Sequence, residues 1–168
     1  MSESNHDSTK KFDFKKEHML KAIELSRQNL STLQGGPFGA VITRNGKVIA
    51  EGQNQVLKTH DPTAHAEVVA IRRASESLQS FNLSDCEIYT SCEPCPMCLS
   101  AIYWARIPVI YYGNTRQDAA DISFDDDLIY QEIPLAPEKR KIKSYQCCEV
   151  EARAVFQEWQ KNPSKQLY

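Results

Sequence analysis

Apolar residues near the start of the chain recur at the spacing of a helix. Residues 1–12 are rich in charged and polar side chains, and we expect them to form a disordered tail. From residue 14 to about residue 30, the apolar positions fall on one helical face and comprise Met19, Leu20, Ile23 and Leu30. The pattern therefore predicts an ordered domain that begins near residue 13 and opens with an amphipathic helix.

The pattern then changes to that of a β-hairpin. Gly35-Gly36-Pro37 predicts a loop, and residues 38–42 and 48–52 read as two short strands. Between them stands Arg44-Asn45-Gly46-Lys47. Its Asn-Gly pair favours a type I′ turn, because that turn needs positive φ at both central residues.

Helices and strands alternate over the rest of the chain. Asp61-Pro62-Thr63 introduces a helix, and we predict that Ala64, Val68, Ile71 and Leu78 lie on one of its faces. Apolar runs predict strands at residues 87–90, 109–113 and 144–150, and helical patterns cover residues 95–105, 125–131 and 151–161. This order predicts an α/β fold with three layers, α/β/α, around a five-stranded mixed sheet, in a single domain over residues 13–168.

Composition and cysteine use indicate a cytoplasmic globular protein. Hydrophobic residues make up 41% of the chain and the mean hydropathy is −0.51. No apolar stretch approaches the roughly 20 residues of a membrane span, and the polar N-terminus lacks the apolar core of a signal peptide. Six cysteines without such a signal indicate reduced thiols. We therefore expect no membrane partner.

The charge balance disfavours a nucleic-acid partner. There are 20 Lys and Arg residues against 22 Asp and Glu residues, which gives a net charge of −2. Phosphate backbones reward a strongly basic face, and the one basic cluster, Lys139-Arg140-Lys141 with Lys143, reads as a solvated loop.

Two short motifs carry candidate chemistry. One is Thr63-Ala64-His65-Ala66-Glu67 and the other is Pro94-Cys95-Pro96-Met97-Cys98. Together they match the H-x-E…P-C-x-x-C signature of zinc-dependent deaminases that act on nucleobases. Either motif alone would be a weak signal, because C-x-x-C pairs are common in structural metal sites and redox proteins.

The residue types suit a catalytic zinc site. Cys95 and Cys98 are three residues apart, so on the first turn of a helix their sulfur atoms face the same side. With the imidazole of His65 they would supply three ligands and leave the fourth position of Zn²⁺ for water, as catalytic sites do. Two thiolates leave the metal about neutral and a weak Lewis acid. Glu67, two residues beyond His65, is placed to accept the proton of that water.

A closed, purely structural zinc site is the alternative. Cys92 extends the series to Cys92-x-x-Cys95-x-x-Cys98, so three cysteines and His65 could fill all four positions. Glu93-Pro94 interrupts that run, and we therefore expect Cys92 to lie on the strand side of the turn. The open, catalytic site is the prediction, and a small zinc-stabilised binding module is the non-enzyme alternative.

These motifs lie within a longer resemblance. From about residue 14 to Tyr168 the chain resembles the cytidine-deaminase-fold family and, within it, is similar to bacterial-type guanine deaminases. The segments that carry the likeness are 35–42, 51–54, 61–67, 89–106 and 124–126 with 129–130. The Phe124-Asp125-Asp126 stretch and the terminal Tyr168 discriminate best among base deaminases.

The resemblance implies roles for individual residues. His65, Cys95 and Cys98 would bind zinc, and Glu67 would move protons. Asn54 would hydrogen-bond the purine, Phe38 and Trp104 would border the base, and Ala66 would belong to the same substrate-binding set. Asp126 would face the exocyclic amine and assist proton transfer, and Tyr168 would close the pocket. The resemblance also implies a homodimer whose subunits exchange their C-terminal segments.

The implied reaction is hydrolytic deamination of guanine to xanthine and ammonia, with zinc as the cofactor and a small purine base as the substrate. Within the same chemistry, guanosine deamination and adenosine deamination in tRNA remain alternatives. The sequence does not rank guanine against guanosine, and the charge balance disfavours tRNA.

Overall fold

The computed structural model describes residues 13–167, so the predicted disordered tail at residues 1–12 and the C-terminal Tyr168 lie outside the described residues. The chain divides into two compact units, residues 1–125 and residues 126–168. The first unit holds the sheet and the helices packed on it. The second holds two helices and a short 3₁₀ turn.

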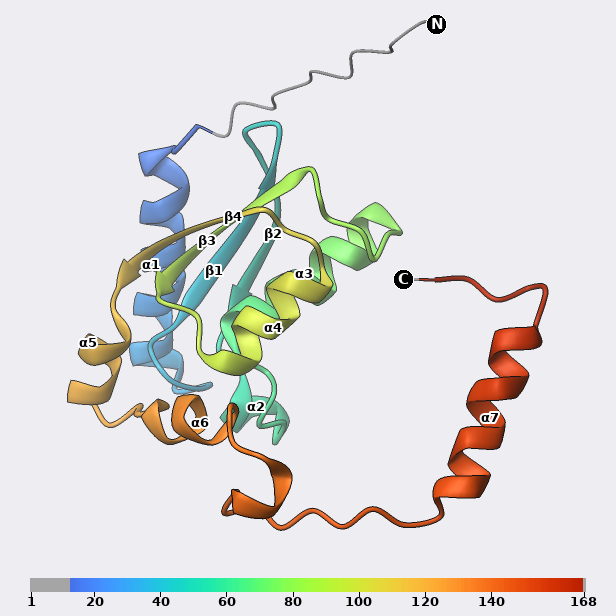
Figure 1. Cartoon of the computed structure of the whole chain (residues 1–168). Coiled ribbons are helices and arrows are strands. Elements are labelled where there is room, and N and C mark those ends of the chain that lie inside the picture. Colours follow the sequence, from blue (N-terminus) through green and yellow to red (C-terminus); the bar gives the residue numbers. More distant parts are fainter. Residues whose placement is uncertain (1–12, 168) are drawn as a thin grey trace, which may run out of the picture. The chain divides into compact units, whose positions relative to one another are not determined.

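A mixed four-stranded sheet organises the first unit. Its strands are β1 (Gly39–Arg44), β2 (Lys47–Gln53), β3 (Cys86–Cys92) and β4 (Val109–Asn114), in the spatial order β2-β1-β3-β4. β1 runs antiparallel to both β2 and β3, and β3 runs parallel to β4 (Figure 1). The α/β class and the mixed sheet are thereby confirmed.

The first hairpin forms as the Asn-Gly pair predicts. Asn45 has φ 52° and Gly46 has φ 72°, so both central residues lie in the left-handed region that a type I′ turn requires. The turn holds two residues, because Arg44 and Lys47 pair with each other across the strands.

Helices cover both faces of this sheet. α1 (Lys16–Thr32) packs against one face, where Ala22 and Leu25 meet Val41 and Tyr89. α3 (Ala66–Leu78) and α4 (Pro96–Trp104) cover the other face (Figure 1). The core there is larger and includes Ala40, Ile42, Ala66, Ala70, Ala74, Ile88 and Ile102. Successive strand residues point to opposite faces, which is why Ile88 and Tyr89 belong to different cores.

The fully buried residues of α3 are not those of the predicted apolar face. Ala66, Val69, Ala70 and Ala74 are buried, whereas Val68, Ile71 and Leu78 are only partly buried, and Ala64 precedes the helix. The reason is the close approach of α3 to β2. A Cβ built on Gly52 would lie 2.1 Å from the carbonyl oxygen of Ala66. Only small residues fit where a helix lies this close to a strand.

The prediction of a fifth strand at residues 144–150 is wrong. Residues 144–148 have no strand structure, and α7 (Glu149–Lys161) begins within the predicted range. An apolar run becomes a strand only where a neighbour satisfies its backbone hydrogen bonds. Among the described residues, this segment has no such neighbour.

The remaining elements are short. α2 (Val56–Thr59) follows β2, and α5 (Arg116–Asp121) follows β4. The second unit contains α6 (Asp127–Glu132), η1 (Pro137–Lys139) and α7. α6 corresponds to the helix predicted over residues 125–131. Within residues 13–167, no helix combines the length and the apolar character that crossing a membrane requires.

Candidate metal centre and active site

Two helix N-termini bring the three predicted zinc ligands together. His65 is the N-cap residue of α3, and Cys95 is the N-cap residue of α4, with Cys98 in the first turn. Pro96 occupies the first turn of α4, where a missing backbone N–H leaves no hydrogen bond unmade. β3 ends at Cys92 and leads directly into this turn. The hairpin tip lies at the opposite end of the sheet, because Arg44 pairs with Cys86 at the start of β3.

The spacing of the donor atoms fits a tetrahedral zinc ion. Nδ1 of His65 lies 3.6 Å from Sγ of Cys95 and 3.6 Å from Sγ of Cys98. Tetrahedral zinc with Zn–S and Zn–N bonds of usual length places sulfur and nitrogen about 3.6 Å apart. All three donor atoms lie within 4.8 Å of one another. The two soft sulfurs and one imidazole nitrogen form a donor set that selects zinc over magnesium or calcium.

The two sulfurs share their protons unequally. The pKa of Cys95 is lowered to about 4, chiefly by the neighbouring Cys98 side chain and further by His65. The pKa of Cys98 is raised by the neighbouring Cys95 side chain and by burial. The pKa of His65 is raised by its hydrogen bond with Cys95. The pair therefore already favours one negative charge, and a divalent cation would favour a second.

Cys92 does not belong to this cluster. Among the described residues, the group of candidate ligands within mutual reach contains His65, Cys95 and Cys98 only. The Cys92 thiol instead donates to the carbonyl oxygen of Thr115 at 3.5 Å. Burial raises the pKa of Cys92 to about 11, which disfavours the thiolate that a zinc ligand must be. The geometry therefore leaves the fourth ligand position open.

Glu67 lies beside the cluster and is almost fully buried, with 6% of its surface exposed. Its Oε2 accepts a hydrogen bond from the Cys98 thiol at 3.4 Å, and its Oε1 accepts one from the Thr90 hydroxyl at 3.2 Å. Burial raises the pKa of the Glu67 carboxyl, because water no longer solvates its charge. A buried carboxyl next to a metal cluster is well placed to exchange protons with a bound water.

Asn54 and Phe38 stand next to each other in the same unit. The backbone N–H of buried Asn54 donates to the carbonyl of Phe38 at 3.1 Å. The Asn54 side-chain oxygen accepts from the N–H of Val56 at 3.2 Å. The Gly35 backbone lies against that side chain, since a Cβ on Gly35 would meet Asn54 Oδ1 at 2.0 Å. Phe38 meets Phe124 edge to face, with ring centroids 5.0 Å apart.

The other predicted site residues are placed differently. Ala66 is fully buried between His65 and Glu67. Trp104 ends α4 and is 69% exposed. Its backbone stands about 9 Å along the helix axis from Cys98, at about 1.5 Å per residue. Asp126 is the N-cap residue of α6 in the second unit.

Sequence reasoning missed two residues that form hydrogen bonds close to the site, one to Glu67 and one in the turn before His65. Thr90 looks like an ordinary strand residue, and only its tertiary contact with Glu67 distinguishes it. Asp61 accepts hydrogen bonds from the backbone and hydroxyl of Thr63, at 2.8 and 2.7 Å, and pairs with Arg72 at 3.4 Å. The Asp-x-Thr pattern could have indicated this local turn before His65.

The match to a protein family and the similarity to solved structures agree with this geometry. Residues 13–114 match the family described as the cytidine and deoxycytidylate deaminase zinc-binding region. Guanine deaminase of Bacillus subtilis (strain 168) is 49% identical over 148 residues, which cover 88% of this chain and 95% of that protein. The X-ray structure of the Bacillus subtilis guanine deaminase superposes with a TM-score of 0.89 at 47% identity, covering 93% of this chain and 99% of that one.

Two further relatives are similar over shorter stretches. A structure of guanine deaminase from Nitrosomonas europaea is 32% identical with a TM-score of 0.64, covering 68% of this chain and 66% of that one. A tRNA-specific adenosine deaminase of Agrobacterium fabrum is 46% identical over 77 residues, 46% of this chain and 51% of that protein. These findings confirm the predicted zinc cofactor and a hydrolase of the deaminase type. The chain belongs to the cytidine and deoxycytidylate deaminase zinc-binding family.

Proposed function

We propose that this chain hydrolyses guanine to xanthine and ammonia in a zinc-dependent reaction. The observation that carries the proposal is the three-ligand cluster with zinc spacing and an adjacent buried carboxylate, Glu67. The choice of guanine rests on the likeness to the Bacillus subtilis guanine deaminase over almost its whole length. The tRNA-specific adenosine deaminases are similar over shorter stretches, for example 46% or 65% of this chain against 88% for the guanine deaminase, so tRNA is the weaker candidate.

The chain's own residues account for the proton transfers. Zinc held by His65, Cys95 and Cys98 would supply the Lewis acidity that makes water a nucleophile at neutral pH. Glu67 accepts a proton from that water as the water oxygen bonds to the guanine carbon that bears the amine. Glu67 passes this proton to a ring nitrogen. It then takes the second proton from the hydroxyl now bonded to that carbon and gives it to the amine, so that the C–N bond breaks and ammonia leaves. One water is consumed, and its oxygen becomes the new carbonyl of xanthine.

Burial supports this role of Glu67. Because burial raises the pKa of the Glu67 carboxyl, the carboxylate is a stronger proton acceptor than an exposed glutamate. The Glu67 side chain belongs to the first turn of α3, where the N-terminal N–H groups have no partner within the helix. The backbone N–H of Ala66 in that turn is a donor of this kind and suits a carbonyl oxygen of the base.

The remaining substrate contacts are proposed by residue chemistry. The Asn54 oxygen is held by Val56, and its amide nitrogen can donate to a purine ring nitrogen or carbonyl. Phe38 offers an aromatic surface to the base plane. Asp126 would accept from the exocyclic amine and assist its protonation.

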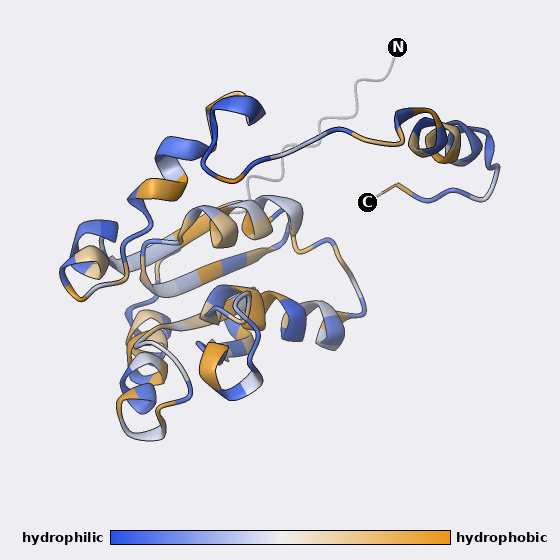
Figure 2. Cartoon of the chain, turned by 90° about the horizontal axis from the view of Figure 1, so that it is seen from below, coloured by the Kyte–Doolittle hydropathy of each residue, from blue (hydrophilic) through white to orange (hydrophobic). Residues whose placement is uncertain are grey.

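We further propose a homodimer that exchanges C-terminal segments, in which Tyr168 reaches the pocket of the neighbouring subunit. Trp104 would border the base together with Phe38. α7 supports this arrangement, since apolar residues recur along it among polar ones (Figure 2). Trp159 lies four residues after Val155 and three after Phe156, and all three are exposed, with Phe156 at 78%. Such a stripe is normally covered by another apolar surface. The second unit would then complete the deaminase domain predicted over residues 13–168.

One substrate screen tests the proposed function. Zinc-loaded protein is incubated with guanine, guanosine, adenine, adenosine and a tRNA, and ammonia and the product base are measured for each. We expect ammonia from guanine, with xanthine in equal amount, and no inosine in the tRNA. If ammonia comes from guanosine alone, or if inosine forms in the tRNA, then guanosine or tRNA replaces guanine as the proposed substrate. If the protein binds zinc but releases ammonia from none of these substrates, the non-catalytic zinc module is the better interpretation.

A further inference from the structure

Glu67 needs a fixed orientation, and the structure shows what provides it. The carboxylate has two oxygens in different surroundings. Oε2 faces the ligand cluster, 3.4 Å from Sγ of Cys98, and Oε1 faces the Thr90 hydroxyl at 3.2 Å. A carboxylate that is free to rotate would present either oxygen to the cluster. One that is held at Oε1 presents Oε2 alone.

Thr90 has a fixed position because it lies in the middle of the sheet and is buried. It lies on β3, between two neighbours, and pairs with Ala40 of β1 and with Tyr112 of β4. Its side chain is 1% exposed. It points to the same face of the sheet as Ile88, which belongs to the core under α3 and α4. A β-branched side chain in the middle of a sheet has little rotamer freedom, so its hydroxyl stays where the backbone places it.

The Thr90 hydroxyl has two acceptors within reach. One is Oε1 of Glu67, and the other is the carbonyl oxygen of Cys92 at 2.9 Å. The Cys92 carbonyl lies at the end of β3, just before the turn that carries Cys95. The hydroxyl therefore connects the strand, the turn before the ligand helix and the carboxylate of Glu67.

We propose that Thr90 is a positioning residue for the deamination reaction, whose hydroxyl anchors Oε1 of Glu67 so that Oε2 faces the reacting water. The inference rests on the proposed function, because it assigns Thr90 a role in the proton transfers of Glu67. A small displacement of a catalytic group from its reactive position lowers the rate of the chemical step. Glu67 is not expected to carry much of the binding energy of the base. The expected defect therefore lies in kcat, with the KM for guanine little changed.

The chain offers a matched control in Thr43. This residue is also a fully buried threonine on a strand of the same sheet, and its Oγ1 has no hydrogen-bond partner among the described residues. Replacing threonine by valine keeps the shape and removes the hydroxyl. Thr90→Val and Thr43→Val thus make the same chemical change in two buried strand positions, of which only one touches Glu67.

The experiment compares Thr90→Val, Thr90→Ser and Thr43→Val with the wild type. For each protein we measure kcat and KM for guanine, bound zinc per chain, and the melting temperature. We expect Thr90→Val to lower kcat per bound zinc by about tenfold or more, since general acid–base groups contribute about 100-fold or more to rates. KM and zinc content should match the wild type. Thr90→Ser, which keeps the hydroxyl, should restore most of the rate, and Thr43→Val should lower neither kcat nor melting temperature.

Each contrary result overturns a defined statement. Unchanged kcat in Thr90→Val, or equal defects in the serine and valine variants, overturns the role of Thr90. So does a loss of activity that merely follows a loss of zinc, because the hydroxyl would then act only through the turn at Cys92. If the wild type releases ammonia from another amino-heterocycle but not from guanine, the substrate assignment fails, and the same variants test Thr90 on that substrate. A wild type that releases no ammonia from any substrate overturns both.

Discussion

A Gly52→Ala substitution tests whether the close packing of α3 on the sheet sets the geometry of the metal centre. In a Gly52→Ala variant the new Cβ would lie 2.1 Å from the Ala66 carbonyl oxygen and 2.7 Å from the backbone nitrogen of Ala70, whereas ordinary contact begins at 3.4 Å. Both atoms are backbone, so no flexible side chain can move aside. The N-terminal turn of α3 must withdraw by about 1.3 Å, the difference between 2.1 and 3.4 Å.

That displacement has two calculable effects. Overpacking of this kind costs about 1–3 kcal/mol, and the backbone contacts place Gly52→Ala near the upper end. For a chain of this size, about 3 kcal/mol lowers the melting temperature by about 6–12 °C. His65 and Glu67 move with the turn, and an error of about 1 Å in a catalytic group costs about 100-fold in rate. Zinc–ligand distances vary by only about 0.2 Å between sites, so displacement of His65 should lower zinc affinity as well.

The assay combines thermal denaturation, zinc content and the rate of guanine deamination. Gly46→Ala serves as the control, because Gly46 has φ 72° and a Cβ there meets nothing within 4 Å. It should cost about 1 kcal/mol of backbone strain and leave zinc and rate unchanged. A Gly52→Ala protein with the zinc content, rate and stability of the wild type would refute the reasoning.

Three further predictions concern other parts of the molecule. Glu67→Gln should keep zinc and lose turnover. Cys95→Ala should lose zinc and stability, whereas Cys92→Ala should keep zinc. Zinc lost in Cys92→Ala but kept in Cys95→Ala would contradict the ligand assignment. Deletion of residues 166–168 should lower kcat/KM about tenfold, or about 1.4 kcal/mol, with zinc unchanged, and unaltered kinetics would remove Tyr168 from the site. Burial raises the pKa of Tyr89 to about 12, above its ordinary value of 10.0, so the folded state keeps this proton longer than the unfolded chain. The contribution of Tyr89 to the free energy of unfolding should therefore be fully present below pH 10 and decline as the pH rises toward 12. Chemical denaturation should show a smaller decline in Tyr89→Phe.

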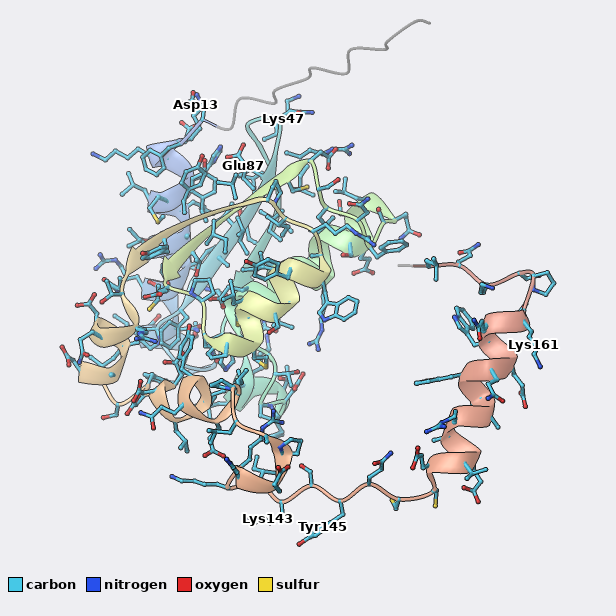
Figure 3. The ribbon with its side chains drawn as sticks, in the orientation of Figure 1. Asp13, Lys47, Glu87, Lys143, Tyr145 and Lys161 are labelled. Atoms are coloured by element: carbon cyan, nitrogen blue, oxygen red, sulfur yellow. The ribbon has the colours of Figure 1, made fainter. Side chains whose placement is uncertain are left out.

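The alkaline prediction has a structural basis at the end of the sheet opposite the metal centre. The Tyr89 hydroxyl donates to Glu87 at 3.1 Å and accepts from the backbone N–H of Lys15 at 3.1 Å. Figure 3 shows Asp13, Lys47 and Glu87 at this end of the sheet. Ionising the phenol would place a second negative charge beside Glu87, which adds to the cost of burial.

The sequence predicted the ligands well because their geometry is local. His65 and the pair Cys95 and Cys98 stand at helix starts that proline and short loops mark, and their spacing along the chain decides which way they face. The Asn45-Gly46 turn was equally accessible, since only a few residue types adopt positive φ at both positions. In these cases the residue type and its immediate neighbours determine the conformation.

Features that depend on distant neighbours were predicted poorly. The run at residues 144–150 has the composition of a strand, but a strand also needs a pairing partner, which composition does not reveal. The buried face of α3 is set by its distance from Gly52, and the role of Thr90 by a contact with Glu67 across the core. The positions of Asp126 and Tyr168 near the substrate, and the dimer that would bring Tyr168 there, remain predictions.

Isotope-labelled water tests the central claim most directly. Zinc-loaded wild type and Glu67→Gln, matched in zinc content, are incubated with guanine in heavy-oxygen water, and xanthine is examined by mass spectrometry. Hydrolytic deamination predicts xanthine and ammonia in equal amounts from the wild type, with one heavy oxygen in each new xanthine, and almost none from Glu67→Gln. Absence of labelled xanthine from the zinc-loaded wild type, or equal rates for the two proteins, would contradict the account.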